Sequence, residues 1–330
     1  MTLPPENEGP SSSTAPATAP APAPATAPAP AGDSAAGTAT ADGARAAQSQ
    51  LHHVAYSELL YEVRAGVATI TLNRPDRRNP IGPTTVGELL HALDRAQHDD
   101  AVRVVVLTGA GKVFSAGGDL SQMAQTAQTA QGAGAAQSVT PLQSGTAENR
   151  RAGTFVDLNL MLAGNGIGKP TIAKVNGHAM AGGLGLVVAC DLAIAADDAQ
   201  FATPEVNVGL WPMMIMATIF RNVPRKKAME LILTGDRLDA ATAERLGLIT
   251  RAVPRDRLDA EVQALCDKLI AKSPLIMRMG LSAFHATQDL ELEPALRHLE
   301  GELARVLGTE DAAEGLLAFL QKRQAVWKGR

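Results

Sequence analysis

The sequence predicts an α/β protein that continues into a helical C-terminal region. Strand-type and helix-type hydrophobic patterns alternate from Tyr56 to about Pro254, which indicates repeated strand and helix units. From Leu258 to Trp327 only amphipathic helical spacing is found. In addition, two of the predicted strands run into glycine-rich segments. We therefore expect a disordered tail at 1–52, an α/β core at 53–255 and a helical region at 256–330.

Composition excludes several classes of protein. The 330 residues carry a formal net charge of -4 and are 45% hydrophobic, which is enough apolar material for one large domain or two small ones. A chain with 3% aromatic residues and no basic stripe does not predict nucleic-acid binding. No apolar run approaches the ~20 residues that cross a bilayer. Cys190 and Cys266 are isolated, so we expect reduced buried thiols, a cytoplasmic location and no metal site.

The first 52 residues are rich in Ala, Pro and Thr. They lack the basic start and the apolar core of a secretory signal, and Arg45 is their only basic residue. Such a composition buries too little apolar surface to offset the entropy lost on ordering. It predicts a disordered tail.

The core begins with a predicted hairpin. Residues 59–63 and 67–71 alternate apolar with small or polar side chains, and Arg64, Ala65 and Gly66 join them. A helix is predicted at 86–93, followed by a buried β-branched strand at 102–107 and a glycine turn at 108–111. This order predicts a first unit of strands and helix.

A second unit follows with the same order of elements. The patterns predict a helix at 154–162, a strand at 171–175, a glycine-rich segment at 176–185 that enters another helix, and a short strand at 193–195. Farther on, Asp239 and Gly247 are placed as the N-cap and the C-terminal glycine of a helix. Residues 122–146 are rich in Gln, Ala, Thr and Gly without apolar periodicity, so we expect a mobile loop there.

Two glycine segments are candidates for binding an anion. Gly118 follows a buried strand, and Gly182 lies between a strand and a helix start, where free N–H groups and the helix dipole favour negative charge. Backbone N–H groups there can stabilise an oxyanion on a substrate carbonyl. Glu205, directly after Pro204 in an apolar stretch, is the candidate proton carrier because burial raises a carboxyl pKa.

Three rival motifs fail on their residues. The segment 164–169 resembles a phosphate loop, but Ala163 replaces its first glycine and Pro170 replaces the Ser or Thr that holds magnesium. Ser115 is not part of a Gly-x-Ser-x-Gly elbow, and His178 has no acidic partner in sequence. We interpret His178 as structural.

An ordered set of motifs resembles the enoyl-CoA hydratase/isomerase (crotonase) superfamily and covers nearly everything after Tyr56. The segments are 69–75, 114–120, 176–185, 204–205, 233–237, 243–249 and 319–323. The resemblance implies a spiral of ββα units, a helical trimerisation region and a homotrimer or hexamer. It also implies an acyl-CoA substrate, with no further cofactor, whose thioester oxygen lies between the N–H groups of Gly118 and Gly182.

One departure from the family pattern bears on the reaction. Glu205 matches one family glutamate, but the second, three residues beyond Gly182, is Gly185 here. A double-bond shift needs one base, whereas hydration of an enoyl thioester uses two carboxylates, so isomerisation is favoured. Hydration stays open if another acid reaches the site, the candidates being Asp119, Glu148 and Asp157. Decarboxylation, thioester hydrolysis and a non-catalytic acyl-CoA-binding role also remain open.

The resemblance suggests further substrate contacts. Arg77 and Arg78 match a place near CoA phosphates, although an exposed arginine pair needs no ligand. Trp211, with Met213 and Met214, either lines the acyl pocket or belongs to the core. The remaining expected contacts with the thioester are Ala116, Gly117, Asp119, Leu120, Gly183 and Pro204.

Overall fold

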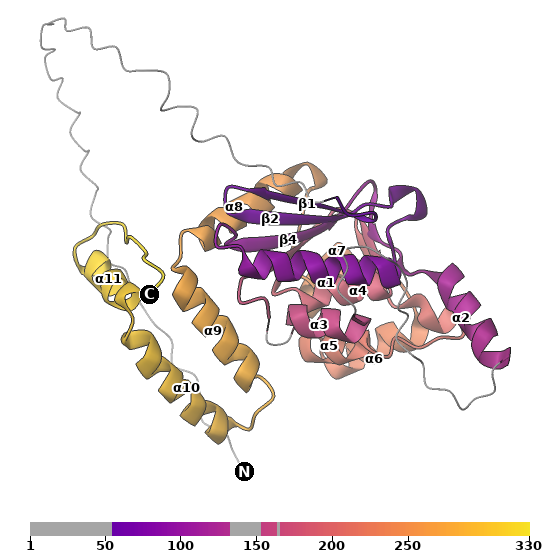
Figure 1. Cartoon of the computed structure of the whole chain (residues 1–330). Coiled ribbons are helices and arrows are strands. Elements are labelled where there is room, and N and C mark those ends of the chain that lie inside the picture. Colours follow the sequence, from indigo (N-terminus) through magenta and orange to yellow (C-terminus); the bar gives the residue numbers. More distant parts are fainter. Residues whose placement is uncertain (1–54, 133–152, 164–165) are drawn as a thin grey trace, which may run out of the picture. The chain divides into compact units, whose positions relative to one another are not determined.

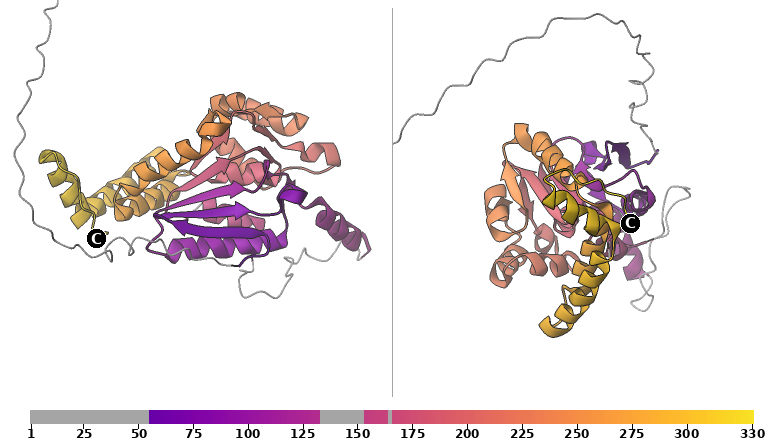
Figure 2. Two further views of the ribbon diagram at one scale, coloured as in Figure 1. Left: turned by 90° about the horizontal axis from the view of Figure 1, so that it is seen from above. Right: turned by 90° about the vertical axis from the view of Figure 1, so that its left-hand side faces the viewer.

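The computed structural model describes residues 55–132, 153–163 and 166–330 (Figure 1). Its main sheet has six strands in the order β1-β2-β4-β7-β9-β12. The first pair is antiparallel and the other neighbours are parallel, and Figure 2 shows the strands side by side. The strands are β1 (Leu59–Arg64), β2 (Val67–Leu72), β4 (Val104–Gly109), β7 (Thr171–Val175), β9 (Leu192–Ala196) and β12 (Arg251–Val253).

The predicted hairpin is confirmed. β1 and β2 pair from Leu59 with Leu72 to Arg64 with Val67. The two residues between them, Ala65 and Gly66, have φ angles of 48° and 83°. Two positive φ angles in succession are typical of the short turn whose twist matches that of the strands.

Two smaller sheets place the glycine segments next to one another. One has the order β11-β10-β8-β5, and the other pairs β3 with β6. Since β5 pairs with β8, the segment after β5 and the segment after β8 leave neighbouring strands at the same end. The strands are β3 (Pro80–Ile81), β5 (Val113–Ser115), β6 (Gly117–Gly118), β8 (His178–Met180), β10 (Gln200–Ala202) and β11 (Leu238–Asp239).

Helices cover both faces of the main sheet. Val104, Val106 and Ile194 point toward α8 (Leu258–Ile270), where Leu258, Val262 and Cys266 complete one apolar cluster. Alternate strand residues such as Val105 and Leu107 belong to a larger cluster with α1 (Pro83–His98) and α4 (Gly182–Ala189). The strands are therefore buried on both faces, as their continuous apolar runs predict.

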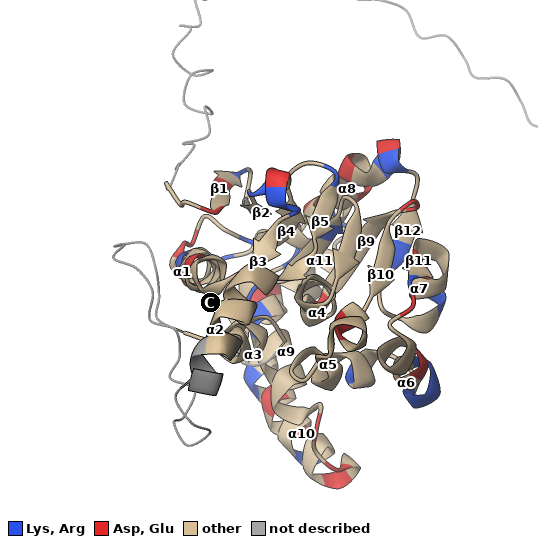
Figure 3. Cartoon of the chain, turned by 90° about the vertical axis from the view of Figure 1, so that its right-hand side faces the viewer, with Lys and Arg blue, Asp and Glu red and all other residues tan. Residues whose placement is uncertain are grey.

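Helix α4 lies at the centre of the helical layer. All its residues from Gly183 to Ala189 are buried. It contacts β6, β8, α3 (Phe155–Ala163) and α5 (Ile215–Asn222), and Figure 3 shows α3 and α5 beside it. The other helices of the core are α6 (Arg225–Thr234), α7 (Ala240–Leu246) and the short 3-10 helices η1 (Pro75–Arg77), η2 (Pro204–Val208) and η3 (Arg255–Arg257).

The C-terminal region is helical, as predicted. After α8 come α9 (Pro274–Thr287), α10 (Leu292–Leu307) and α11 (Glu310–Leu320). Ser273 and Thr309 cap α9 and α11 by accepting bonds from Ile276 N and Ala312 N. The Asp239 cap of α7 is likewise confirmed, since its side chain accepts from Thr242 N. Within the described ranges, none of the helices is both long and apolar enough to cross a membrane.

The expected mobile loop at 122–146 is wrong in its first part. Helix α2 runs from Leu120 to Gly132, and residues 133–146 lie outside the described residues. Asp119 caps this helix, because its Oδ1 accepts from Ser121 N and Gln122 N. A helix rich in Ala and Gln has good intrinsic propensity without an apolar stripe, so a search for periodicity alone misses it.

Candidate active site

The backbone nitrogen of Gly118 lies next to the start of α4. The N–H groups on either side bond elsewhere: Gly117 N donates to Ser115 Oγ at 3.1 Å, and Asp119 N donates to Ile81 O at 3.2 Å. Gly182 lies close by, since its Cβ position is 3.8 Å from Gly118 N.

Gly182 is the first residue of α4. No side chain caps this helix, so the N–H groups of its first turn are not bonded by a capping side chain. A Cβ on Gly117 would lie 2.5 Å from Ala181 Cβ and 3.2 Å from Gly182 N, and Gly117 has a φ of 93°. Only glycine fits there. The structure thus brings the predicted donors Gly118 and Gly182 together, and Gly183 packs beneath them on Ser115.

Glu205 lies on the segment that follows a strand next to β8. Ala202, the last residue of β10, pairs with Met180 and accepts a hydrogen bond from Ala181 N at 2.9 Å. The chain then turns at Pro204 into η2, which carries Glu205. Two residues therefore separate Glu205 from Ala202, which is bonded to Ala181, the residue just before α4.

The surroundings of Glu205 raise the pKa of its carboxyl group. Burial raises its pKa above the ordinary value, while a backbone hydrogen bond opposes this rise. Its Oε2 is buried and has no hydrogen-bond partner in the described part of the chain. A buried carboxyl oxygen without a partner is available to a substrate.

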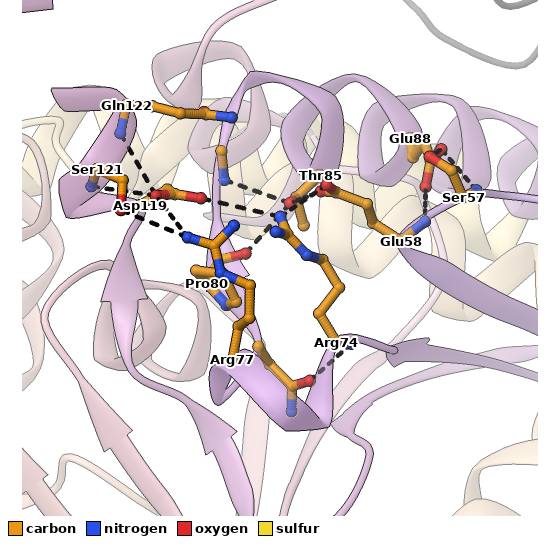
Figure 4. A network of polar contacts seen from close by, with 12 residues as sticks. Ser57, Glu58, Arg74, Arg77, Pro80, Thr85, Glu88, Asp119, Ser121 and Gln122 are labelled. Atoms are coloured by element: carbon orange, nitrogen blue, oxygen red, sulfur yellow. Dashed lines mark hydrogen bonds and ion pairs between the residues drawn. The ribbon is translucent and has the colours of Figure 1, made fainter. Parts of the chain in front are cut away.

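Asp119, next to the other donor, is hydrogen-bonded through Oδ1, while its buried Oδ2 has no hydrogen-bond partner among the described residues and lies in an ion pair with Arg74. Its side chain is 2% exposed and lies 3.5 Å from Arg77 Nη2 and 3.9 Å from Arg74 Nη1. Arg74 also pairs with Glu58 at 2.7 Å, and Glu58 accepts from Thr85 Oγ1. Figure 4 shows both guanidinium groups directed at Asp119. This network ties the segment that carries Gly118 to β1 and α1.

Neighbouring side chains occupy the space around Gly185, where the family pattern has its second glutamate. A Cβ on Gly185 would lie 2.3 Å from Ile215 Cγ2 and 3.4 Å from Phe155 Cζ. Separations under 3.0 Å require a neighbour to shift, so a larger residue at 185 does not fit this packing. Gly185 is thus a close contact between α4, α5 and α3.

The other candidate acids do not replace that glutamate in the described residues. Asp119 is held by its arginines and by the start of α2. Asp157 accepts from Thr154 N at 2.6 Å and Thr154 Oγ1 accepts from Asp157 N, which is a capping box at the start of α3. Glu148 lies outside the described residues.

Several other predicted contacts are exposed. Ala116 and Arg78 lie on the surface, and Leu120 is 56% exposed. Arg77 is half-exposed beside Asp119. Trp211 donates from Nε1 to Met216 Sδ at 3.3 Å, and Met213 and Met214 are exposed. The pocket role of these last three residues stays a prediction.

The dismissed motifs have structural roles. His178 Nδ1 accepts from Gln200 N at 3.2 Å, which links β8 to β10. Lys169 Nζ donates to Ala96 O and Asp99 O, at the end of α1. Both cysteines are buried and free, and burial raises the pKa of Cys266 to about 11. Within the described residues no group of His, Cys, Asp and Glu could hold a metal ion.

Sequence reasoning missed four residues near the site. Phe155 Cζ lies 3.7 Å and Ile81 Cδ1 3.6 Å from the Cβ position of Gly182. Arg74 belongs to the Asp119 network, and Asn79 donates to three backbone carbonyls around β5. Asn79 has a φ of 52°, a conformation that asparagine tolerates. An asparagine a few residues after the Asn-Arg-Pro turn was therefore the one sequence signal that could have pointed to this residue.

Comparison with known proteins identifies the family. The model of the family "Enoyl-CoA hydratase/isomerase" matches residues 62–330, most of the chain. The chain belongs to the enoyl-CoA hydratase/isomerase family and has the crotonase fold with C-terminal helices. It is an enzyme of this acyl-CoA-metabolising family.

Individual relatives are named mainly as hydratases. A putative enoyl-CoA hydratase of Thermus thermophilus is 37% identical over 260 residues, which cover 78% of this chain and 95% of the relative. The 2,3-dehydroadipyl-CoA hydratase of Escherichia coli is 30% identical over 275 residues, or 83% and 100%. The crystal structure of an enoyl-CoA hydratase of Mycobacterium smegmatis superposes with a TM-score of 0.70 at 32% identity, covering 82% of this chain and 98% of that one.

Proposed function

We propose that this enzyme moves a proton on the acyl group of a CoA thioester, with Glu205 as the proton carrier. The N–H groups of Gly118 and Gly182 hold the thioester oxygen and stabilise the enolate that forms when the proton leaves. One such donor is typically worth about 3 kcal/mol of barrier. The observation that carries the proposal is the buried Glu205 Oε2 without a hydrogen-bond partner in the described residues, on the segment that follows the strand bonded to the start of α4.

Isomerisation of an enoyl-CoA double bond is the reaction that the geometry favours. One base removes a proton from one carbon and returns it to another, so a single carboxylate suffices. The packing of Ile215 and Phe155 around Gly185 supports this reaction, because it leaves no room there for a second acid.

Hydration is the second candidate, and the names of the relatives support it better than isomerisation. The Thermus and Escherichia relatives, like the Mycobacterium structure, are named as hydratases. In this reaction Glu205 would take a proton from a water molecule whose oxygen adds to the β-carbon, and would return a proton to the α-carbon. The packing at Gly185 supports isomerisation, whereas the names of the relatives support hydration. A direct assay of both reactions decides between them.

The deciding experiment measures both reactions on acyl chains of one length. Wild-type enzyme is assayed with a 2-enoyl-CoA for water addition and with the matching 3-enoyl-CoA for the double-bond shift. We expect a higher kcat/KM for the shift, and a loss of about 10²–10⁴-fold in the Glu205→Gln variant with acyl-CoA affinity retained. Glu230→Gln, an exposed glutamate of α6, is the control.

Each contrary result has a distinct meaning. Faster water addition assigns hydration instead, and full turnover in Glu205→Gln refutes the role of Glu205. Binding of CoA thioesters without turnover of either substrate makes the chain a non-catalytic acyl-CoA-binding member.

We further propose a homotrimer or hexamer with a cytoplasmic location. The C-terminal helices support assembly, since Leu292, Leu296, Leu303 and Leu307 of α10 are each more than half exposed. Relatives from Dictyostelium discoideum, Mus musculus and Rattus norvegicus are named as mitochondrial, so location requires imaging of the tagged chain. Light scattering that gives the mass of one chain would refute assembly.

A further inference from the structure

The side-chain atoms nearest to the Cβ positions of the two proposed oxyanion donors belong to apolar residues. Around the Cβ position of Gly182, the nearest side-chain atoms are Ile81 Cδ1 at 3.6 Å and Phe155 Cζ at 3.7 Å. At Gly118 the nearest is Met123 Sδ at 3.0 Å. One turn farther along α4, Gly185 faces Ile215 and the same Phe155 Cζ. Phe155 Cζ therefore lies close to the Cβ positions of both Gly182 and Gly185, at 3.7 Å and 3.4 Å.

We propose that Phe155 determines specificity by holding an unsubstituted hydrocarbon chain beside the thioester and by keeping water from that side of the acyl group. This inference rests on the proposed function. It adds the substrate class, an enoyl chain without hydroxyl or carboxylate groups on the carbons nearest the thioester. It also assigns the exclusion of water to a named residue.

The backbone of Phe155 is held in place on three counts. The capping box of Thr154 and Asp157 fixes the first turn of α3. Asn159 Nδ2 donates to Phe155 O at 2.8 Å. Leu158, in the same turn, is fully buried, which anchors the helix to the core. Because the backbone that carries the aromatic ring is held in place, the ring can discriminate between substrates.

Water has little to bind on this surface. A water molecule in a protein interior needs two to four polar partners. The side-chain atoms nearest to Gly182 and Gly185 are carbon atoms of Ile81, Phe155 and Ile215, and these offer none. We expect a proton taken by Glu205 to be returned to an acyl group that lies on such a surface instead of being exchanged with solvent.

The test places a hydroxyl group on the very atom concerned. Phe155→Tyr adds an oxygen to Cζ, whereas Phe155→Leu, the matched control, removes the ring and stays apolar. Each variant is assayed in deuterium oxide with a 3-enoyl-CoA, and deuterium in the isomerised product is measured by mass spectrometry. The ratio of hydration to isomerisation is measured for the same chain length.

We expect Phe155→Tyr to raise both deuterium incorporation and the hydration ratio by about tenfold relative to Phe155→Leu, because a polar group lowers discrimination against a polar co-substrate. We also expect it to accept a 4-hydroxy-substituted chain that the wild type rejects. Equal incorporation and equal ratios in the two variants would overturn the inference.

Two further measurements keep the result interpretable. If Phe155→Tyr does not fold, Ile215→Thr against Ile215→Val makes the same comparison, since Thr and Val differ by one hydroxyl group at similar volume. The Glu205→Gln variant is run in parallel. Lost turnover in that variant with identical Tyr and Leu results refutes only the role of Phe155, whereas retained turnover refutes the proposed function itself.

Discussion

The two sides of the candidate site are built in different ways. The Gly118 side is held by charged groups, with Asp119 between Arg74 and Arg77 and with Glu58 behind Arg74. The Gly182 side is held by close packing, in which glycines of α4 touch Ser115, Ile215 and Phe155. Paired charges hold a segment in place by electrostatic attraction. Close packing around glycines instead brings hydrocarbon side chains up to the backbone. The two carboxylates therefore differ in charge pairing: Asp119 lies between two arginines, whereas none of the ion pairs found among the described residues involves Glu205, the proton carrier that we propose.

The largest effect on stability is expected on the charged side. Asp119→Asn removes the charge that pairs with Arg74 and accepts a hydrogen bond from Arg77, and hydrogen bonds to charged groups are worth about 1.5–3 kcal/mol. We expect the free energy of unfolding to fall by about that amount in urea denaturation. Asp259→Asn is the control, because Asp259 is 85% exposed and its pair with Lys174 contributes at most about 1 kcal/mol. Equal losses in both variants would contradict the distinction.

A smaller loss is expected from crowding the packed side. Gly185→Ala places a methyl group 2.3 Å from Ile215 Cγ2, and overpacking typically costs about 1–3 kcal/mol. Combining it with Ile215→Ala relieves this clash, so the double variant loses less than the sum of the two single losses. Gly301→Ala, in open space on α10, is expected to stabilise by about 0.5–1 kcal/mol. Simple additivity in the cycle would contradict close packing at 185.

Replacement of Glu205 is expected to affect stability in the opposite direction from Asp119. Its pKa is raised in the folded state, so the folded protein binds more protons than the unfolded chain between the ordinary and the raised pKa, and stability falls as pH rises through that window. Glu205→Gln removes this cost, and we expect higher stability than wild type at pH 7. The difference disappears at a pH below the ordinary value of 4.5. Thermal unfolding of both proteins at several pH values tests the sign; a less stable variant at pH 7 would count against burial as the cause.

The smallest expected effect concerns the dependence of kcat/KM on pH. A base must be ionised to accept a proton, so the acid limb of kcat/KM should report the pKa of Glu205 in the free enzyme. Because that pKa is raised, the limb lies above pH 4.5. In Asp119→Asn the same limb is expected at an unchanged position. A limb that moves with Asp119 would transfer the proton-carrying role to the charged side.

Much of the fold could be predicted from local patterns. The hairpin of β1 and β2, the strands β4 and β7 and the Asp239 cap follow from periodicity and cap chemistry within about ten residues. Helix α2 could not be found in this way, because its evidence is intrinsic propensity and the cap at Asp119 instead of an apolar stripe. The approach of Gly118 to Gly182 was expected from the family resemblance, and the spacing of the motifs alone does not contain it.

The sequence by itself determined which residues were available: two glycine segments after strands, one carboxylate after a proline, and glycine at position 185. Only the tertiary structure decided their use. Phe155 from α3 and Ile215 from α5 close the space at Gly185, Arg74 and Arg77 bind Asp119, and Glu205 Oε2 is left without a hydrogen-bond partner among the described residues. The physical reason is that burial and charge pairing arise between elements far apart in the chain, so whether a carboxylate is paired is settled only when those elements pack.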